Sequence, residues 1–339
     1  MSVRVQAPGL LTTLQGLPLF GQPHPPGEAA HGEASFGGPM DEVSHRLACL
    51  LVGDPPETAS LEITLAGPEL LFQADALIAL TGADLSAEAD GLPVPMWRPV
   101  LVRAGTCLQF GKALDGCRAY LAVAGGFLPT GPDAPEVLVP DIAGSSGHAL
   151  RAGDVLASQP PPIDRYPGLQ RRFQREDRPL LSLGWFLPWF QELDFRRPAS
   201  LRLVLGPHWP ELEAQARKDF LGEVFRVASD SDRMGIRLRG PRLALSRPLG
   251  PVAAPAAPGA LLLHSDGAPV LLMAEGPALS SAPRLGALAP VDHARAAQLR
   301  PGDPCRFRPI TQEEAQHLDQ ERQVRLRTLG CLTAERMAR

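Results

Sequence analysis

One part of the chain constrains the fold more than any other, and it consists of residues 76–84, 91–99 and 116–126. Its apolar runs are short, and glycine, proline or aspartate interrupts each of them. This rhythm is typical of short strands joined by tight turns, and it differs from the alternation of strands and long helices in β-α-β folds. The sequence therefore predicts a barrel-like arrangement of strands here.

Strand-like patterns continue along the chain, whereas helical patterns are few. Apolar spacing predicts a helix over residues 41–52, with Asp41 as its N-cap and Gly53 as its stop. Two further helices are expected over 210–222 and 311–330. Many short strands against few helices indicate a barrel or sandwich. The expected strands are residues 61–65, 70–73, 76–81, 100–103, 107–110, 118–124, 201–205, 224–228, 235–239, 261–263, 270–273 and 305–308.

Composition limits the class of protein. A chain of 339 residues exceeds what one hydrophobic core usually serves, so two domains are expected. The net charge of −4 argues against a nucleic-acid or anionic-membrane partner. The five cysteines form no C-x-x-C pair, so neither a metal site nor a disulfide framework is expected. With no signal-peptide pattern and no apolar run of ~18 residues, a cytoplasmic protein is expected.

Two pairs of short segments suggest an internal duplication. Residues 66–72 resemble residues 239–245, and each segment contains a Gly-Pro step. Residues 150–154 resemble residues 299–303, and each reads Leu-Arg-x-Gly-Asp. Because both pairs occur in the same order, we hypothesise that the chain contains two copies of one β unit.

Seven short motifs occur in one order along the chain. They are Pro8-Gly-Leu-Leu-Thr-Thr-Leu-Gln15, Gly37-Gly-Pro-Met-Asp41, Leu61-Glu-Ile-Thr-Leu-Ala-Gly-Pro68, Thr81-Gly-Ala-Asp84, Met96-Trp-Arg-Pro99, Gly206-Pro-His208 and Ser229-Asp-Ser-Asp-Arg-Met-Gly235. This series resembles the urea-amidolyase-related, biotin-dependent carboxyltransferase family (allophanate hydrolase subunit 2 type), which includes the C subunit of the bacterial ATP-dependent 5-oxoprolinase and the antagonist of a sporulation-kinase inhibitor. The resemblance implies a mainly β fold with a few helices, in which two cyclophilin-like β-barrel domains lie in tandem.

The expected domain organisation follows from this resemblance and from the duplication. Residues 1–157 would form the N-terminal barrel and residues 200–310 the C-terminal barrel. Residues 158–199 would be a Pro-rich connection that packs onto a surface, because it carries two tryptophans. Residues 311–339 would contain the C-terminal helix.

The first candidate site is the turn Gly37-Gly-Pro-Met-Asp41, which leads into a helix N-terminus. The backbone N–H groups at Gly37, Gly38, Met40 and Asp41 could bind a carboxylate or phosphate. The alternative is that Asp41 only caps its own helix.

The second candidate site is the loop of residues 229–233, where Asp232 is a candidate base and Arg233 a candidate partner for a substrate carboxylate. The alternative is that the aspartates of this loop only neutralise Arg233 and tie the turn. Arg98 and Arg284 are further candidates for binding a carboxylate, although Arg98 could equally brace the barrel. We thus expect Asp41, Asp232 and Arg233 to be catalytic, with Arg98 and Arg284 on the substrate anion.

Three stretches depart from the family pattern: residues 13–19, 137–143 and 279–283. In each, polar or glycine-rich loop residues of the family are replaced, while the neighbouring strands keep their pattern. Because loops carry the chemistry of a site and strands carry the fold, this suggests a preserved scaffold with a relaxed or re-purposed site.

The resemblance leaves three functions open. The first is the C subunit of an ATP-dependent 5-oxoprolinase-type amide hydrolase, which would need a smaller cyclophilin-like subunit and a lactam-cleaving subunit; ATP would act through that complex. The second is a non-catalytic binding module that antagonises a small cyclophilin-like kinase inhibitor, which the altered loops favour. The third is a carboxyltransferase subunit resembling that of urea carboxylase. The chain has no Met-Lys-Met acceptor, so biotin would sit on a separate carrier.

Overall fold

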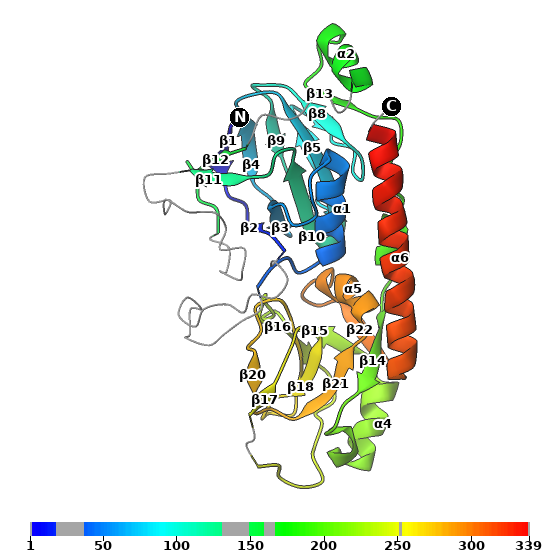
Figure 1. Cartoon of the computed structure of the whole chain (residues 1–339). Coiled ribbons are helices and arrows are strands. Elements are labelled where there is room, and N and C mark those ends of the chain that lie inside the picture. Colours follow the sequence, from blue (N-terminus) through cyan, green and yellow to red (C-terminus); the bar gives the residue numbers. More distant parts are fainter. Residues whose placement is uncertain (1, 18–36, 131–148, 159–166, 251–252, 338–339) are drawn as a thin grey trace.

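The chain is described by a computed structural model that covers residues 2–17, 37–130, 149–158, 167–250 and 253–337. Two β units lie one above the other in Figure 1, and the long helix α6 (Gln312–Met337) runs along the side of both. The predicted fold class, mainly β with a few helices, is confirmed; of the two barrels expected in tandem, the second unit is a closed barrel and the first consists of two packed sheets.

The first unit contains two sheets that pack face to face. Successive side chains of a strand point to opposite faces of its sheet, so the side chains of β5 and β10 pack alternately into two hydrophobic cores. Ile78 and Leu121 join the core shared by the two sheets, whereas Leu77 and Tyr120 pack under α1 (Glu42–Val52). The strand order of one sheet is β11 (Leu128–Thr130), β12 (Val155–Ala157), β1 (Ser2–Ala7), β4 (Glu69–Phe72), β9 (Cys107–Gln109), β6 (Glu88–Ala89), β7 (Leu92–Pro93). The strand order of the other sheet is β13 (Leu180–Ser182), β8 (Val100–Val102), β5 (Ala76–Asp84), β10 (Asp115–Val123), β3 (Ser60–Thr64), β2 (Leu11–Gln15).

The second unit is a closed barrel. Its first and last strands, β14 (Ala199–Leu205) and β22 (Pro304–Ile310), pair in parallel and close the barrel. In its core the rings of Phe220 and Phe307 stack with their centroids 4.9 Å apart. Helix α4 (Ala214–Gly222) supplies Phe220. A separate pair, β17 (Ala254–Pro255) and β20 (Leu279–Ser280), flanks the barrel. The barrel order is β14 (Ala199–Leu205), β21 (Arg284–Leu288), β18 (Ala260–Leu263), β19 (Pro269–Leu272), β16 (Gly235–Arg239), β15 (Phe225–Val227), β22 (Pro304–Ile310).

The Leu-Arg-x-Gly-Asp echo marks equivalent turns in the two units. In the first turn the N–H of Gly153 donates to the Val5 carbonyl (2.8 Å), and in the second the N–H of Gly302 donates to the Val227 carbonyl (2.8 Å). Both glycines have positive φ, 95° and 88°, and each turn precedes a strand. The Gly-Pro echo was misleading, because residues 67–68 precede β4 whereas residues 240–241 follow β16.

Each expected strand overlaps a strand of the structure, and the helices differ at their ends. Helix α1 has its expected Asp41 N-cap and Gly53 C-cap. The helix expected over 210–222 begins later, because a 3₁₀ turn (Trp209–Glu211) precedes α4. Gly330 does not stop the last helix, which continues to Met337. The helices that the sequence did not predict are α2 (Pro167–Arg175), α3 (Phe190–Leu193) and α5 (His293–Ala297), with the 3₁₀ turn Pro290–Asp292.

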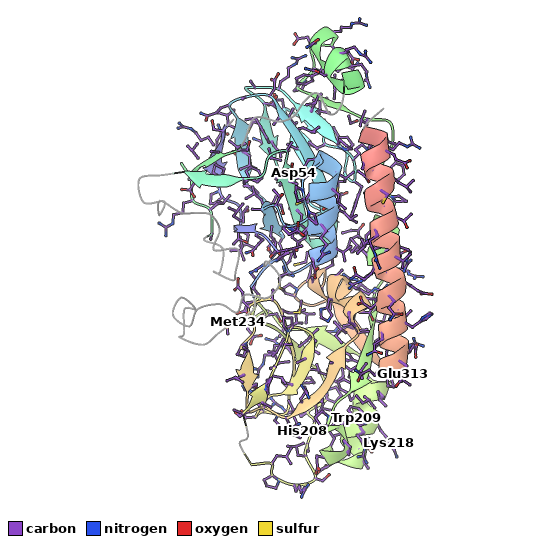
Figure 2. The ribbon with its side chains drawn as sticks, in the orientation of Figure 1. Asp54, His208, Trp209, Lys218, Met234 and Glu313 are labelled. Atoms are coloured by element: carbon purple, nitrogen blue, oxygen red, sulfur yellow. The ribbon has the colours of Figure 1, made fainter. Side chains whose placement is uncertain are left out.

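Helix α6 spans the two units. Near its start, which Figure 2 marks with Glu313, Ala315 packs against the second unit. Farther along, Leu326 and Leu329 pack against the core beneath α1. Gly330 lies opposite Leu50 of α1, and a Cβ at Gly330 would be 3.8 Å from the nearest side-chain atom. The helix therefore fixes both units with one apolar stripe.

Because that space is sufficient for a methyl group, Gly330→Ala should raise the free energy of unfolding by about 0.5–1 kcal/mol, the helix-propensity difference. Gly302→Ala is the matched control: it also has open space, but its φ of +88° disfavours alanine, so it should lower stability by about 1–2 kcal/mol. Urea denaturation of both variants measures the two values. Destabilisation by Gly330→Ala would contradict the described packing of α6 on α1.

Candidate functional site

The candidate site begins at the turn that leads into α1. Gly37 and Gly38 have φ of 65° and 87°, a left-handed conformation that favours glycine. The turn brings Met40 out of the first unit, and its side chain lies within the hydrophobic core of the second unit. The turn therefore links the two units.

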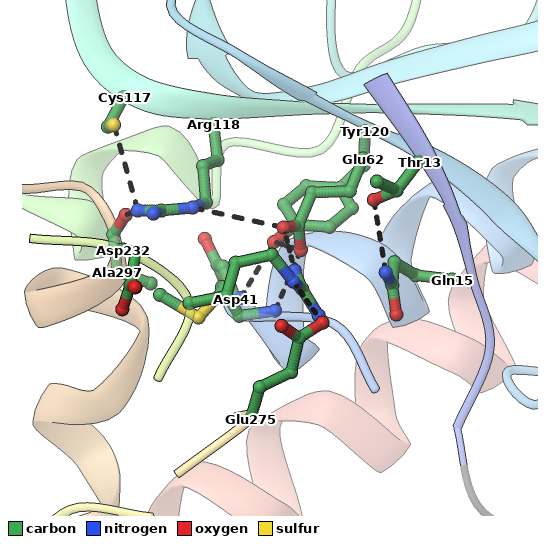
Figure 3. A network of polar contacts seen from close by, with 12 residues as sticks. Thr13, Gln15, Asp41, Glu62, Cys117, Arg118, Tyr120, Asp232, Glu275 and Ala297 are labelled. Atoms are coloured by element: carbon green, nitrogen blue, oxygen red, sulfur yellow. Dashed lines mark hydrogen bonds and ion pairs between the residues drawn. The ribbon is translucent and has the colours of Figure 1, made fainter. Parts of the chain in front are cut away.

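Beside this turn a carboxylate is buried on β3. The side chain of Glu62 is 1% exposed, and its Oε2 accepts hydrogen bonds from the N–H of Met40 (2.7 Å) and the hydroxyl of Tyr120 (2.8 Å). Its Oε1 pairs with the guanidinium of Arg233, and Nε of Arg118 lies 3.8 Å away (Figure 3). Burial acts to raise the pKa of Glu62, but the two arginine charges and the two hydrogen bonds together hold it below its usual value.

Arg233 reaches this carboxylate from the second unit. It lies on the loop between β15 and β16, and the label of the next residue, Met234, marks the junction of the units in Figure 2. Its Nε donates to Oε1 of Glu275 (2.7 Å), its Nη2 to the carbonyl of Gly38 (2.7 Å) and its Nη1 to Glu62. Although burial opposes the charge, the two glutamates raise the pKa of Arg233, so it stays protonated.

Asp41 forms a second bridge between the units. Its carboxylate accepts hydrogen bonds from the N–H (3.0 Å) and the hydroxyl (2.6 Å) of Ser44 and from Nε2 of Gln298 (2.9 Å), which belongs to the second unit. Its own N–H donates to the hydroxyl of Tyr120 (2.7 Å). Burial raises the pKa of Asp41 and outweighs the hydrogen bonds that lower it.

The structure thus brings five of the sequence-predicted site residues together: Gly37, Gly38, Met40, Asp41 and Arg233. The N–H groups of Met40 and Asp41, expected to hold a substrate anion, bond to the protein's own Glu62 and Tyr120. All three guanidinium nitrogens of Arg233 have protein acceptors. These groups hold the two units together in this structure, and direct contact with a ligand would require them to exchange partners.

Arg98 lies elsewhere, between β7 and β8 of the first unit, and it contacts the segment that connects the two units. Its Nη1 donates to the carbonyl of Leu183 (3.2 Å), and its guanidinium lies over the ring of Phe186, 5.1 Å from the centroid. These contacts are those expected of a residue that braces the barrel, the alternative weighed for it above.

Asp232 is drawn beside the network in Figure 3, although its side-chain hydrogen bonds go to its own turn, and Arg284 lies apart from the network. Oδ1 of Asp232 accepts hydrogen bonds from the N–H groups of Met234 and Gly235, and these bonds stabilise the turn that contains Asp232. Arg284 begins β21, and its N–H donates to Nδ1 of His208 (2.9 Å). Figure 2 shows His208 at the end of the barrel that faces away from the first unit. Arg284 therefore does not share a site with Arg233.

The sequence reasoning missed five members of the network: Glu62, Arg118, Tyr120, Glu275 and Gln298. A detectable signal existed for the first three. Glu62 is an acidic residue on a strand whose five residues are all buried, and Arg118 and Tyr120 lie on one face of β10. Buried charges are rarely left unpaired, so a charge within an apolar strand predicts a partner. No such signal marks Gln298, which only the docking of the units brings close.

A cleft of about 320 Å³ lies next to the turn. Gly37, Gly38 and Met40 line one side, and the second unit lines the other, including His293. Arg322 of α6 also reaches the cleft. Burial and the nearby charge of Arg322 lower the pKa of His293, so its imidazole is neutral near pH 7. The cleft thus combines a neutral imidazole, a guanidinium and the carboxylate of Glu42 with a mostly apolar lining.

Metal clusters and membrane spans are both missing from the described ranges. There, no three His, Cys, Asp or Glu side chains are grouped to hold a metal ion. Likewise, no helix among those ranges is long and apolar enough to cross a membrane. The departures at residues 137–143 and at 18–19 lie outside the described residues.

Comparison with known proteins gives consistent matches. The family model of the carboxyltransferase domain, subdomain A and B, matches residues 34–309. Urea amidolyase of Saccharomyces cerevisiae is 28% identical over 348 residues, covering 97% of this chain and 18% of that protein. The C subunit of 5-oxoprolinase from Escherichia coli is 30% identical over 297 residues, covering 85% of this chain and 87% of that protein. The crystal structure of the K. lactis urea amidolyase matches with a TM-score of 0.76 at 25% identity, covering 96% of this chain and 20% of that chain.

The buried ion pair generates a prediction about stability and pH. Glu62→Gln should lower the free energy of unfolding by about 3–5 kcal/mol at pH 7, because it leaves the buried guanidinium of Arg233 short of one charge partner. Glu275→Gln is the control. Because the side chain of Glu275 is 20% exposed, water can take over its hydrogen bond to Arg233, and the free energy of unfolding should fall by less.

Since the folded pKa of Glu62 is lowered from 4.5, its stabilisation is present above pH 4.5 and is lost as the pH falls through the folded value. The difference between wild type and Glu62→Gln should therefore narrow on acidification, measured by urea denaturation across pH. A difference that stays constant or widens below pH 4.5 would show that Glu62 is not held ionised by Arg233.

Proposed function

The chain belongs to the carboxyltransferase domain family, subdomain A and B, and we propose that within it the chain is the C subunit of an ATP-dependent 5-oxoprolinase-type amide hydrolase. The observation that carries this proposal is the extent of the match. The similarity reaches across 87% of the C subunit of a 5-oxoprolinase, whereas the chain spans 18–20% of the urea amidolyases it resembles.

In this proposal the substrate, 5-oxoproline or an activated form of it, enters the cleft beside Gly37 and Gly38. Arg322 binds its carboxylate, since a guanidinium forks onto carboxylates. His293 is neutral near pH 7 and so can accept a proton as a general base. Asp41 and Arg233 act as positioning residues, because they hold the wall of the cleft and do not touch substrate.

The proposal requires partners. A smaller cyclophilin-like subunit and a lactam-cleaving subunit complete the site, and ATP acts through the assembled complex in the cytoplasm. The proposed domain boundaries remain residues 1–157, 158–199, 200–310 and 311–339, with β13 of the connecting segment pairing with β8 of the first unit.

A second candidate is a carboxyltransferase subunit that works with biotin on a separate carrier. The observation in its favour is the likeness to the urea amidolyase structure over 96% of this chain. In this case the cleft between the units would receive the carboxylated carrier and an amide-bearing acceptor such as urea.

The test is reconstitution of the chain with the two partner subunits from the same organism. We expect ATP-dependent release of glutamate from 5-oxoproline, and we expect His293→Ala to lower kcat by about 10²-fold or more through loss of the base. His317→Ala is the control, because this histidine is 71% exposed on α6, and it should leave turnover unchanged.

Other outcomes separate the three functions. Equal turnover in both variants would remove His293 from the mechanism. A stable complex without turnover would favour a non-catalytic binding module, and biotin-dependent carboxylation of urea would favour the carboxyltransferase.

A further inference from the structure

A second cavity, of about 220 Å³, adjoins the cleft on the other side of Arg322. It lies between α3, α5, α6 and β14. Four arginines line it, Arg202, Arg295, Arg322 and Arg325, and Glu192 is the single carboxylate among the described lining residues. We propose that this cavity is a binding site for a small anion that carries a phosphate or carboxylate group.

Two of the guanidiniums are fixed in place by one buried carboxylate. Asp292 is fully buried and accepts two hydrogen bonds from the guanidinium of Arg202 (2.6 and 2.9 Å), one from its backbone N–H (2.7 Å) and one from the guanidinium of Arg295 (3.1 Å). Its side chain lies behind the arginines and does not line the cavity. The arginine forks are therefore oriented before a ligand arrives, which reduces the entropy lost on binding.

The other two arginines come from α6. Arg322 is held by Asp319 (2.6 Å) and by the carbonyl of Pro290 (2.9 Å), and Arg325 pairs with Glu192 (2.9 Å). Asp319, like Asp292, does not line the cavity. Asp194, 3.7 Å from Arg295, also lies outside the cavity lining, so the four arginines are matched by four carboxylates, of which only Glu192 is among the described lining residues.

Unused donors point to a ligand. Within the described part of the chain, five arginine Nε atoms are buried without a hydrogen-bond partner, and two of them, those of Arg295 and Arg322, belong to guanidiniums that line this cavity. A buried donor without an acceptor costs about 1–3 kcal/mol, so such groups usually serve a function or bind a molecule that the protein alone does not provide. An oxyanion in the cavity would supply acceptors to guanidiniums from two different elements.

Size and lining restrict the class of ligand. The volume is below the roughly 300–1,000 Å³ of sites for drug-sized molecules, so a nucleotide is too large and a phosphate or short dicarboxylate fits. Trp189 and Leu193 give the cavity an apolar wall, which suits the carbon chain of a dicarboxylate. This inference does not depend on the proposed function.

The test is titration of the purified chain with inorganic phosphate and, separately, with glutamate, followed by calorimetry at constant ionic strength set with chloride. We expect saturable binding of at least one anion, weakened about 10-fold or more in Arg325→Gln and in Arg295→Gln, which corresponds to at least about 1.4 kcal/mol. Arg327→Gln removes the same charge from the same helix but not from the cavity, and it should bind as wild type does.

Which anion binds identifies the source of the ligand. Saturation by phosphate alone assigns a phosphoryl group, and saturation by glutamate alone assigns a dicarboxylate. Because Arg325 is half-exposed, Arg325→Gln should fold as wild type does, which thermal unfolding checks. The proposal is overturned if neither anion binds, or if all three variants weaken binding equally, since the effect would then come from net charge.

Discussion

The Glu62 carboxylate is the group on which the relation of the two β units most depends. It is buried on β3 between two apolar residues, where an unpaired charge would greatly lower the stability of the fold. Arg118 of the same unit lies 3.8 Å away, but the cation in direct contact with Glu62 is Arg233 of the other unit, which also binds the carbonyl of Gly38. The docking of the units therefore supplies the direct ion-pair partner of Glu62, and the same contact fixes the glycine turn.

This constraint explains why the candidate site has its present form. With Met40 inserted into the barrel core and Asp41 bonded to Gln298, the turn cannot move independently of either unit. The open space that remains lies beside the turn, where Arg322 of α6 separates the cleft from the arginine-lined cavity. Helix α6 lies beyond the part matched by the family model, which ends at residue 309, yet it supplies residues to both spaces.

The sequence predicted most of the fold because period-2 apolar patterns and caps are local signals. Strands such as β6 and β17, with two residues each, are too short to produce such a pattern. The site was predicted only in part. Asp41 and Arg233 belong to recognisable motifs, but whether a motif residue faces a ligand or a buried partner depends on contacts between distant segments. Gly330 was mispredicted for the same reason. A glycine at this position predicts the end of a helix, but the helix continues and Gly330 packs beside Leu50 of another segment.

The central claim is that Glu62 and Arg233 couple the two units, and a double-mutant cycle tests it most directly. Urea denaturation of Glu62→Gln, Arg233→Gln and the double variant gives the interaction free energy at pH 7. The account predicts a coupling of about 2–3 kcal/mol, with one cooperative unfolding transition in the wild type. Additivity within about 0.5 kcal/mol would show that the two residues do not hold the units together.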